Sequence, residues 1–194
     1  MILSKRSFIK ICRFFTKLPT CGLCKFVQTI DKTMITRIVS FILILYAAFY
    51  FGFFFGGILA PWPDEVSGRT FAEYHKAIDF YMGKRMPILV LSGMFFMLVF
   101  LVSDRKNWRK ASFKLIAFTF VFQIGVIILG INTNVALNPV MNAWNPDQLP
   151  ANWEAIRDQW LGYHQRNTPL HFIIAITLFL ACYFYWTRPK VEGE

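Results

Sequence analysis

Three asparagines at regular spacing are the first feature of this sequence that suggests chemistry. Asn134, Asn138 and Asn142 are four residues apart, so they would lie along one face of a helix. Their neighbours are largely apolar, and an amide without a partner in apolar surroundings costs roughly 2–7 kcal/mol. We therefore expect these amides to face other helices or a polar pocket. Pro139, which has no backbone N–H, should bend the helix. A purely structural role, in which the asparagines only hold helices together, stays open.

A second polar stripe follows further along the chain. Its members recur at steps of three or four residues: Trp153, Ile156, Trp160, His164, Asn167 and His171. The stripe is aromatic at one end and hydrogen-bonding at the other, so it combines a surface for flat rings with groups that exchange protons near neutral pH. Asn152, just before it, is placed to cap a helix. His164 and His171 could also ligate a metal or haem, although the HxxxH and HExxH patterns are absent.

His75 is the third candidate, on a helix predicted to begin near Thr70. The run Thr70-Phe-Ala-Glu73 has the form of a capping box, in which two side chains satisfy free backbone N–H groups at the start of a helix. On that helix the imidazole shares a face with Phe71, Tyr74, Ile78 and Tyr81. Such a face points to neighbouring helices. His75 is therefore either a hydrogen-bonded packing residue or a proton acceptor. Pro87, further on, either opens the next helix or kinks the chain.

Four long apolar runs carry these residues and identify a membrane protein. They cover residues 38–60, 87–102, 115–131 and 170–186. A hydrocarbon core of about 30 Å requires about 20 helical residues, which the shorter runs reach by extending into neighbouring amphipathic sequence. With 194 residues and four spans, the chain has room for one compact bundle and no separate soluble domain. We therefore predict an all-α, integral membrane four-helix bundle with short extracytoplasmic helices.

The charges between the runs predict the orientation in the membrane. Basic residues cluster before the first run and between the second and third runs: Lys5, Arg6, Lys10, Arg13, Lys17, Lys25, Lys32 and Arg37, then Arg105, Lys106, Arg109, Lys110 and Lys114. Lys and Arg are retained on the cytoplasmic side, so both termini should be cytoplasmic. The net charge of +10 thus lies mainly on the predicted inner face, where anionic lipid headgroups are the expected partner. Nucleic-acid binding is not expected.

The N-terminal segment has a character of its own. Apolar residues at helical spacing face one side and basic residues the other: Phe8, Ile11, Phe15 and Leu18 against Arg6, Lys10, Arg13 and Lys17. This pattern predicts an amphipathic helix in the plane of the inner leaflet, with an organelle-targeting segment as the alternative. Cys21 and Cys24 form a lone CxxC pair, for which we expect a structural or incidental role. The predicted organisation is a basic segment over 1–37, a membrane domain over 38–186 and a cytoplasmic tail over 187–194.

The third connection and the start of the last span resemble the anthrone oxygenase-like family of small four-helix membrane proteins. The motifs that carry the resemblance are Asn134-Val-Ala-Leu-Asn138, Trp160-Leu-Gly-Tyr-His164 and Arg166-Asn-Thr168, and the likeness extends over about residues 38–186. The chain departs from the family pattern at two points. Ala136 stands where the family has a proline, and Asn167 stands where an arginine is expected, with Arg166 one residue early.

The resemblance implies that molecular oxygen oxidises a lipophilic phenolic ketone, an anthrone, to a quinone without a bound cofactor. Such chemistry needs a base to form the phenolate or enolate, and cationic or amide donors to stabilise the anion. The catalytic candidates are His164, His75 and Arg166. The substrate-binding candidates are Asn134, Asn138, Asn142, Trp160, Tyr163 and Asn167, with the aromatic pair stacking against flat rings. No metal site is expected.

Two other functions also fit the sequence. A non-catalytic bundle, such as an accessory subunit or a protein that binds lipid or a small molecule, would use the polar stripe to hold its helices together. An electron-transfer protein would bind haem through its histidines. Serine hydrolase and glycosidase functions are not supported, because the sequence has no nucleophile elbow and no paired carboxylates. Gly56-Gly57 lies inside an apolar run and not in a nucleotide-binding loop.

Overall fold

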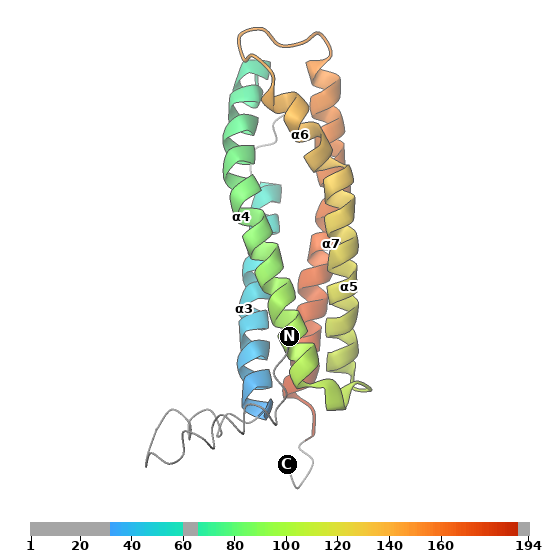
Figure 1. Ribbon diagram of the computed structural model, residues 1–194. Coiled ribbons are helices and arrows are strands. Elements are labelled where there is room, and N and C mark those ends of the chain that lie inside the picture. Colours follow the sequence, from blue (N-terminus) through green and yellow to red (C-terminus); the bar gives the residue numbers. More distant parts are fainter. Residues whose placement is uncertain (1–31, 60–65, 190–194) are drawn as a thin grey trace, which may run out of the picture.

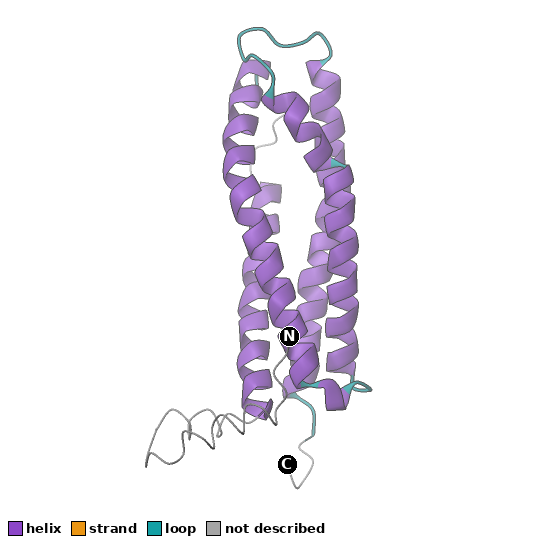
Figure 2. Cartoon of the chain, viewed as in Figure 1, coloured by secondary structure: helices purple, strands orange, loops and turns teal. Residues whose placement is uncertain are grey.

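The computed structural model describes residues 32–59 and 66–189, and this part of the chain is almost entirely helical (Figures 1 and 2). In chain order the elements are α3 (Lys32–Leu59), α4 (Gly68–Ser103), the 3-10 helix η2 (Arg105–Asn107), α5 (Ala111–Asn132), α6 (Asn134–Asn142) and α7 (Trp153–Trp186). The four long helices lie side by side, which confirms the predicted all-α four-helix bundle. The predicted amphipathic helix, the Cys21 and Cys24 pair and the last five residues lie outside the described ranges.

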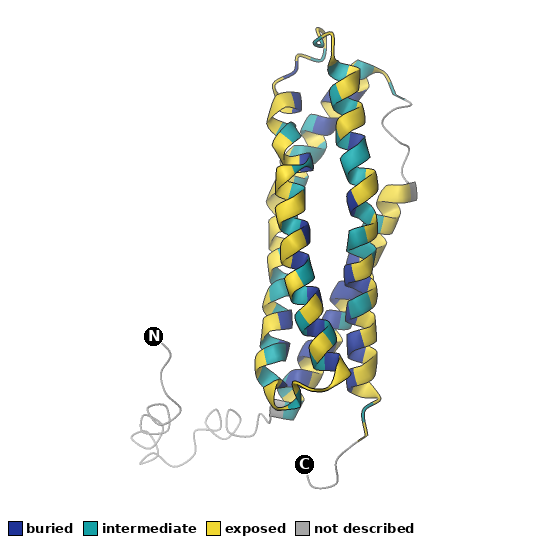
Figure 3. Cartoon of the chain, turned by 90° about the vertical axis from the view of Figure 1, so that its right-hand side faces the viewer, coloured by how far each residue is buried: buried dark blue, intermediate teal, exposed yellow. Residues whose placement is uncertain are grey.

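Four helical stretches are long and apolar enough to cross a membrane: Thr33–Ile58, Gly68–Ser103, Ala111–Asn142 and Trp153–Trp186. Their outward faces are lined with exposed residues, many of them large and apolar (Figure 3). Ile88 and Val121, for example, are 71% and 67% exposed. A helix that is apolar on nearly all sides needs other helices or lipid around it. The chain is therefore a multi-pass membrane protein, as predicted.

The two ends of the bundle differ in charge. We call the end where α3 begins and α7 ends the basal end, and the opposite end the distal end (Figure 1). The basal end carries basic residues on α3, in the connection from α4 to α5, on α5 and just after α7: Arg37, Arg105, Lys106, Arg109, Lys110, Lys114 and Arg188. The buried Asp104 accepts hydrogen bonds from Arg188 at 3.1 and 3.2 Å and from Asn107 at 2.8 Å, which ties the end of α7 to the α4–α5 connection.

α4 and α7 are longer than the predicted spans. The sequence left open whether Pro87 opens the second span or kinks the helix that leads into it. In the structure α4 and α7 each continue into the span without a break, with Pro87 inside α4 and Pro169 inside α7, and separate short helices before these two spans are not seen in the described residues. A proline removes only one backbone hydrogen bond, and membrane helices tolerate this where their neighbours compensate. At 1.5 Å per residue, the 36 residues of α4 extend over about 54 Å, so roughly 20 Å lies beyond a hydrocarbon layer of about 30 Å.

The start of α4 also differs from the prediction. Ser67 caps the helix, and its hydroxyl accepts a hydrogen bond from the Thr70 backbone N–H at 3.3 Å. The predicted cap at Thr70 is therefore wrong, because Ser67 satisfies the free N–H groups one turn earlier. Glu73 pairs with Arg69 at 3.1 Å instead of reaching back to the cap. Asn152 precedes α7 as predicted, but its side chain makes no capping bond.

The helix that begins at Ala111 breaks at Thr133, whose backbone angles are φ −117° and ψ −94°. The predicted interruption exists, but it lies six residues before Pro139, which sits inside α6. After the break, α6 leaves the direction of α5 and crosses to the distal part of α4 (Figure 1). This change of direction brings the asparagines of α6 into contact with α4.

The apolar core has two parts. The larger cluster fills the region where α3, α4, α5 and α7 meet, with Leu43, Phe100, Ile116 and Leu178 among its fully buried members. The smaller cluster lies at the distal end and has four buried members: Phe71, Ala72, Met141 and Trp144. α3 ends before this level (Figure 1), so the distal part is built from α4, α6 and α7. These three helices position the candidate site.

Candidate polar site between α4, α6 and α7

The asparagine ladder converges on one carboxylate. The amide nitrogens of Asn138 and Asn142 on α6 donate hydrogen bonds to Asp79 on α4, one to each carboxylate oxygen. The two asparagines are one helical turn apart, so a single carboxylate can accept from both. The predicted ladder is thus present, and its partner is an acid on the facing helix.

Further bonds connect the ladder to α7. The indole N–H of Trp160 donates to the side-chain oxygen of Asn138 at 3.1 Å, and the Asn134 amide donates to the Trp160 carbonyl at 3.0 Å. The Asn167 amide donates to the Asn134 side-chain oxygen and to the Thr133 hydroxyl, both at 3.1 Å. Asn134 and Asn167 are buried. We call the assembly the distal polar cluster; it comprises His75, Asp79, Thr133, Asn134, Asn138, Asn142, Trp160, His164 and Asn167.

His75 is the member of the cluster whose polar atoms are not satisfied. Its side chain is 2% exposed, and neither ring nitrogen has a hydrogen-bond partner among the described residues. The edge of its ring meets Trp160, with 5.2 Å between ring centroids. The Asp79 carboxylate and the amides of Asn138 and Asn142 lie close enough to act on the imidazole, but neither amide makes a hydrogen bond of normal geometry with it. The imidazole therefore lies beside amide and carboxylate groups that bond mainly to one another and to Trp160.

The face of α4 that carries His75 is narrower than predicted. Phe71 and His75 are buried, whereas Tyr74 and Tyr81 are 48% and 51% exposed. The prediction of a shared inward face is wrong for the two tyrosines, because among the described residues this part of α4 is covered by α6 and by the Trp160 side chain of α7. Three helices bury a narrower stripe than four would.

His164 and His171 lie in different surroundings. His164 is half-buried beside Trp160, with 4.1 Å between ring centroids, and belongs to the distal polar cluster. His171 lies two turns towards the basal end, where its Nδ1 pairs with the Tyr50 hydroxyl at 2.6 Å and its ring stacks on Phe54 at 3.8 Å. The two histidines therefore do not face one ligand as a pair. In the part of the chain that the structure describes, no group of three or more His, Cys, Asp or Glu side chains could hold a metal ion.

Two predicted site residues lie outside the cluster. Arg166 is exposed, while its neighbour Asn167 is buried and bonded, since one residue turns a helical side chain by about 100°. Tyr163 is half-buried, and its hydroxyl accepts a hydrogen bond from Gln159 on the same helix at 3.0 Å. Asn142 is exposed but bonded to Asp79, so it lies at the edge of the cluster.

Two residues with central positions were not among the predicted site residues. Asp79 lies four residues after His75, and this i, i+4 pair of imidazole and acid just before an apolar run was the available signal. Tyr50 gave no signal, because a tyrosine inside an aromatic-rich span looks like a packing residue. Only the approach of α3 to α7 shows that its hydroxyl meets His171.

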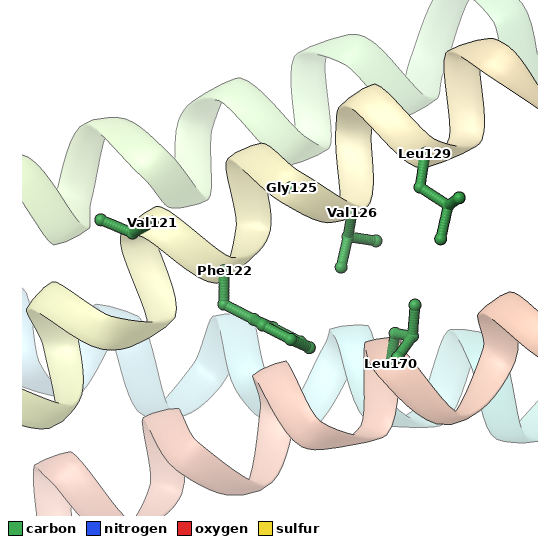
Figure 4. A pocket seen from close by; sticks show the side chains of 6 residues that line it. All are labelled: Val121, Phe122, Gly125, Val126, Leu129 and Leu170. Atoms are coloured by element: carbon green, nitrogen blue, oxygen red, sulfur yellow. The ribbon is translucent and has the colours of Figure 1, made fainter.

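In the distal polar cluster the amides, the carboxylate and the indole donate to and accept from one another. The open polar pocket that the sequence predicts here stays a prediction. Two hollows that the structure does show lie elsewhere. One, of about 410 Å³, is an apolar groove on α5 and α7 (Figure 4); the other, of about 310 Å³, lies beside Arg157 and Gln165 on α7.

Comparison of the chain with family models, with curated proteins and with solved structures finds no match. The membrane bundle and the distal polar cluster are therefore established by the sequence and by the geometry of this structure alone.

Proposed function

We propose that the distal polar cluster is the site at which a lipophilic phenol or enol loses a proton before it is oxidised by molecular oxygen. One observation carries the proposal: the imidazole of His75 is buried, and neither of its nitrogens has a partner among the described residues. Buried polar atoms without a partner are rare and each calls for a specific explanation. A substrate hydroxyl would supply the missing hydrogen bond. The resemblance to the anthrone oxygenase-like family supports the choice of substrate class.

The contacts suggest a role for each group. The O–H proton passes to a nitrogen of His75, and the electron pair stays on the substrate oxygen. Asp79, one helical turn away, stabilises the imidazolium that forms. The amide groups of Asn138 and Asn142 are donors beside His75 that can turn from the carboxylate to the new anion. Conversion of an anthrone CH₂ group to a carbonyl consumes one O₂ and releases one water, so the reaction balances without a reductant.

Entry of a substrate requires the cluster to open. The segment best suited to move is α6, because it has only nine residues and is joined to α5 at the break of Thr133. Its contacts with α4 run through the side-chain bonds to Asp79 and through a small apolar cluster. We further propose, from the excess of basic residues at the basal end, that this end is cytoplasmic and that substrate arrives from the other leaflet.

The test uses purified full-length protein in lipid nanodiscs with an anthrone as substrate. Oxygen consumption and quinone absorbance are followed for the wild type and for His75→Ala and His75→Gln. Loss of a general base should lower the rate by about 10²–10⁴-fold. The matched control is Tyr74→Ala, the neighbouring position on α4, whose side chain is 48% exposed and should be dispensable.

Two results would contradict the proposal. If wild-type nanodiscs consume oxygen no faster than empty nanodiscs, the enzymatic function is wrong for this substrate class. If His75→Ala keeps the wild-type rate and thermal stability, His75 is not the base.

A non-catalytic function is the second candidate, and the closed hydrogen-bond network favours it. In that case the cluster would only join α4, α6 and α7, and the wild type would show no turnover. Asn138→Leu would then lower thermal stability strongly, because it leaves one Asp79 oxygen and the Trp160 indole N–H without a hydrogen-bond partner. Strong destabilisation together with no oxygen uptake would select this function over the enzymatic one.

A further inference from the structure

An apolar groove lies on the surface of α5 and α7 (Figure 4), about one helical turn on the basal side of Thr133 and Asn167. Its lining residues are Val121, Phe122, Gly125, Val126 and Leu129 from α5 and Leu170 from α7, and its volume is about 410 Å³. Val121 and Leu129 are 67% and 39% exposed, so the groove opens to the surface that the bilayer covers. Gly125 leaves it open, since a Cβ at this position would meet no atom within 4 Å.

Along the membrane normal, the groove lies at the level of the headgroup-proximal half of a lipid acyl chain. α5 begins at Ala111 at the basal end, and Leu129 lies about 27 Å further along the helix, close to the distal limit of a hydrocarbon layer of about 30 Å. From Leu129 the groove runs about 12 Å back towards the middle of the membrane, as far as Val121. One end is therefore near the headgroups and the other is near the bilayer centre.

A free cation lies at the headgroup end of this groove. Arg166 precedes Leu170 by four residues, so it occupies the same face of α7 one turn nearer the distal end. It is exposed, and among the described residues it has no ion pair, side-chain hydrogen bond or ring contact.

The cations at a similar depth on α4 are already engaged. Lys84 lies 3.7 Å from the centre of the Phe80 ring, and Arg85 lies 5.1 Å from that of Tyr81. Arg166 differs from both because its guanidinium is available to an anion. A guanidinium can bind two phosphate oxygens at once.

We propose that this groove holds one acyl chain of an anionic phospholipid whose phosphate pairs with Arg166. The apolar walls accept methylene groups and exclude the headgroup, which the cation then holds at the distal end of the groove. The site does not include His75 or any other member of the distal polar cluster. Lipid binding here can therefore be tested separately from the proposed enzymatic function.

The experiment is native mass spectrometry of the full-length protein exchanged into equal amounts of phosphatidylglycerol and phosphatidylcholine. Wild type should retain one phosphatidylglycerol in preference to phosphatidylcholine. Arg166→Gln should lower that preference by roughly fivefold, the effect of one basic group near an anionic lipid surface. Gly125→Leu fills the groove and should reduce retention of both lipids. Lys84→Gln and Gly52→Leu are matched controls, because Lys84 is a cation at similar depth and Gly52 is an exposed glycine with equally open space.

Three outcomes would overturn the proposal. Equal loss of preference in Arg166→Gln and Lys84→Gln would mean that surface charge alone attracts the lipid. Equal retention in Gly125→Leu and Gly52→Leu would mean that the groove is not occupied. Displacement of phosphatidylglycerol by an equal amount of oleate would identify a free fatty acid, and not a phospholipid, as the ligand.

Discussion

Asp79 is the residue that holds the distal polar cluster together. Both of its carboxylate oxygens accept from α6 amides, and it is the only acid in the cluster as defined. Each bond has a charged acceptor; the bond from Asn138 is partly buried, whereas Asn142 is exposed. Hydrogen bonds to charged groups contribute about 1.5–3 kcal/mol, more than bonds between neutral groups. We therefore expect Asp79 to determine whether α6 stays docked.

Asp79→Leu should lower the free energy of unfolding by roughly 1–3 kcal/mol, because it leaves the partly buried Asn138 amide without its charged acceptor. Asp147→Asn is the control: Asp147 pairs with Arg69 at 2.8 Å, but both side chains are more than 60% exposed, and such pairs contribute about 0–1 kcal/mol. Denaturation of the two variants in the same detergent measures the difference. Equal stability of the Asp79→Leu and Asp147→Asn variants would mean that α6 is held by its apolar contacts alone.

The contact between α3 and α4 depends on one small residue. Gly93 is buried in α4, and a Cβ built on it would overlap the ring and hydroxyl of Tyr46 on α3. Small residues allow membrane helices to approach closely, and packing replaces the hydrophobic driving force that lipid removes. The same approach brings Tyr46 and Tyr50 into the interior, where Tyr50 meets His171. Gly93 on α4 therefore affects the hydrogen bond between Tyr50 on α3 and His171 on α7.

Gly93→Ala should therefore destabilise the protein by roughly 1–3 kcal/mol, since an added methyl group in a packed interface forces side chains from their preferred positions. Gly83→Ala on the same helix should leave stability unchanged or raise it by about 0.5–1 kcal/mol, because its Cβ would meet nothing within 4 Å and alanine favours helix. Thermal unfolding monitored by circular dichroism compares them. A neutral Gly93→Ala variant would show that α3 and α4 are further apart than in this structure.

The two ends of the molecule differ in their side chains: basic residues gather at the basal end, and the distal polar cluster lies at the other end. The described residues at the distal end carry both acids and bases, among them Arg69, Glu73, Asp147 and Arg157. Positive charge is retained on the cytoplasmic side during insertion. The arrangement thus favours one orientation in the membrane.

Cysteine labelling tests this orientation. In a variant with Cys12, Cys21, Cys24 and Cys182 replaced by serine or alanine, a cysteine at Asp147 should react with a membrane-impermeant maleimide in intact cells. A cysteine at Lys106 should react only after the membrane is opened. Both positions are exposed in the structure, so access to the protein does not limit the reaction. Labelling of Lys106→Cys alone in intact cells would mean that the basal end is outside.

Much of the architecture could be read from the sequence. Apolar length determines that there are four membrane helices, because each span must satisfy its backbone hydrogen bonds internally. Helical spacing determines that the three asparagines share a face and that Trp160, His164 and Asn167 lie on one stripe. Both are local properties of the chain, and the structure confirms them.

The tertiary structure decided which groups meet. The break at Thr133 sends α6 across to α4, and this long-range placement, not spacing, gives the asparagines Asp79 as their acceptor. It also decided that Asn167 points inward while Arg166 points out, and that the side chains of the cluster bond to one another. Hydrogen bonds between side chains 22 to 63 residues apart depend on how the helices pack. The sequence determines the faces of each helix, but only packing determines which faces come into contact.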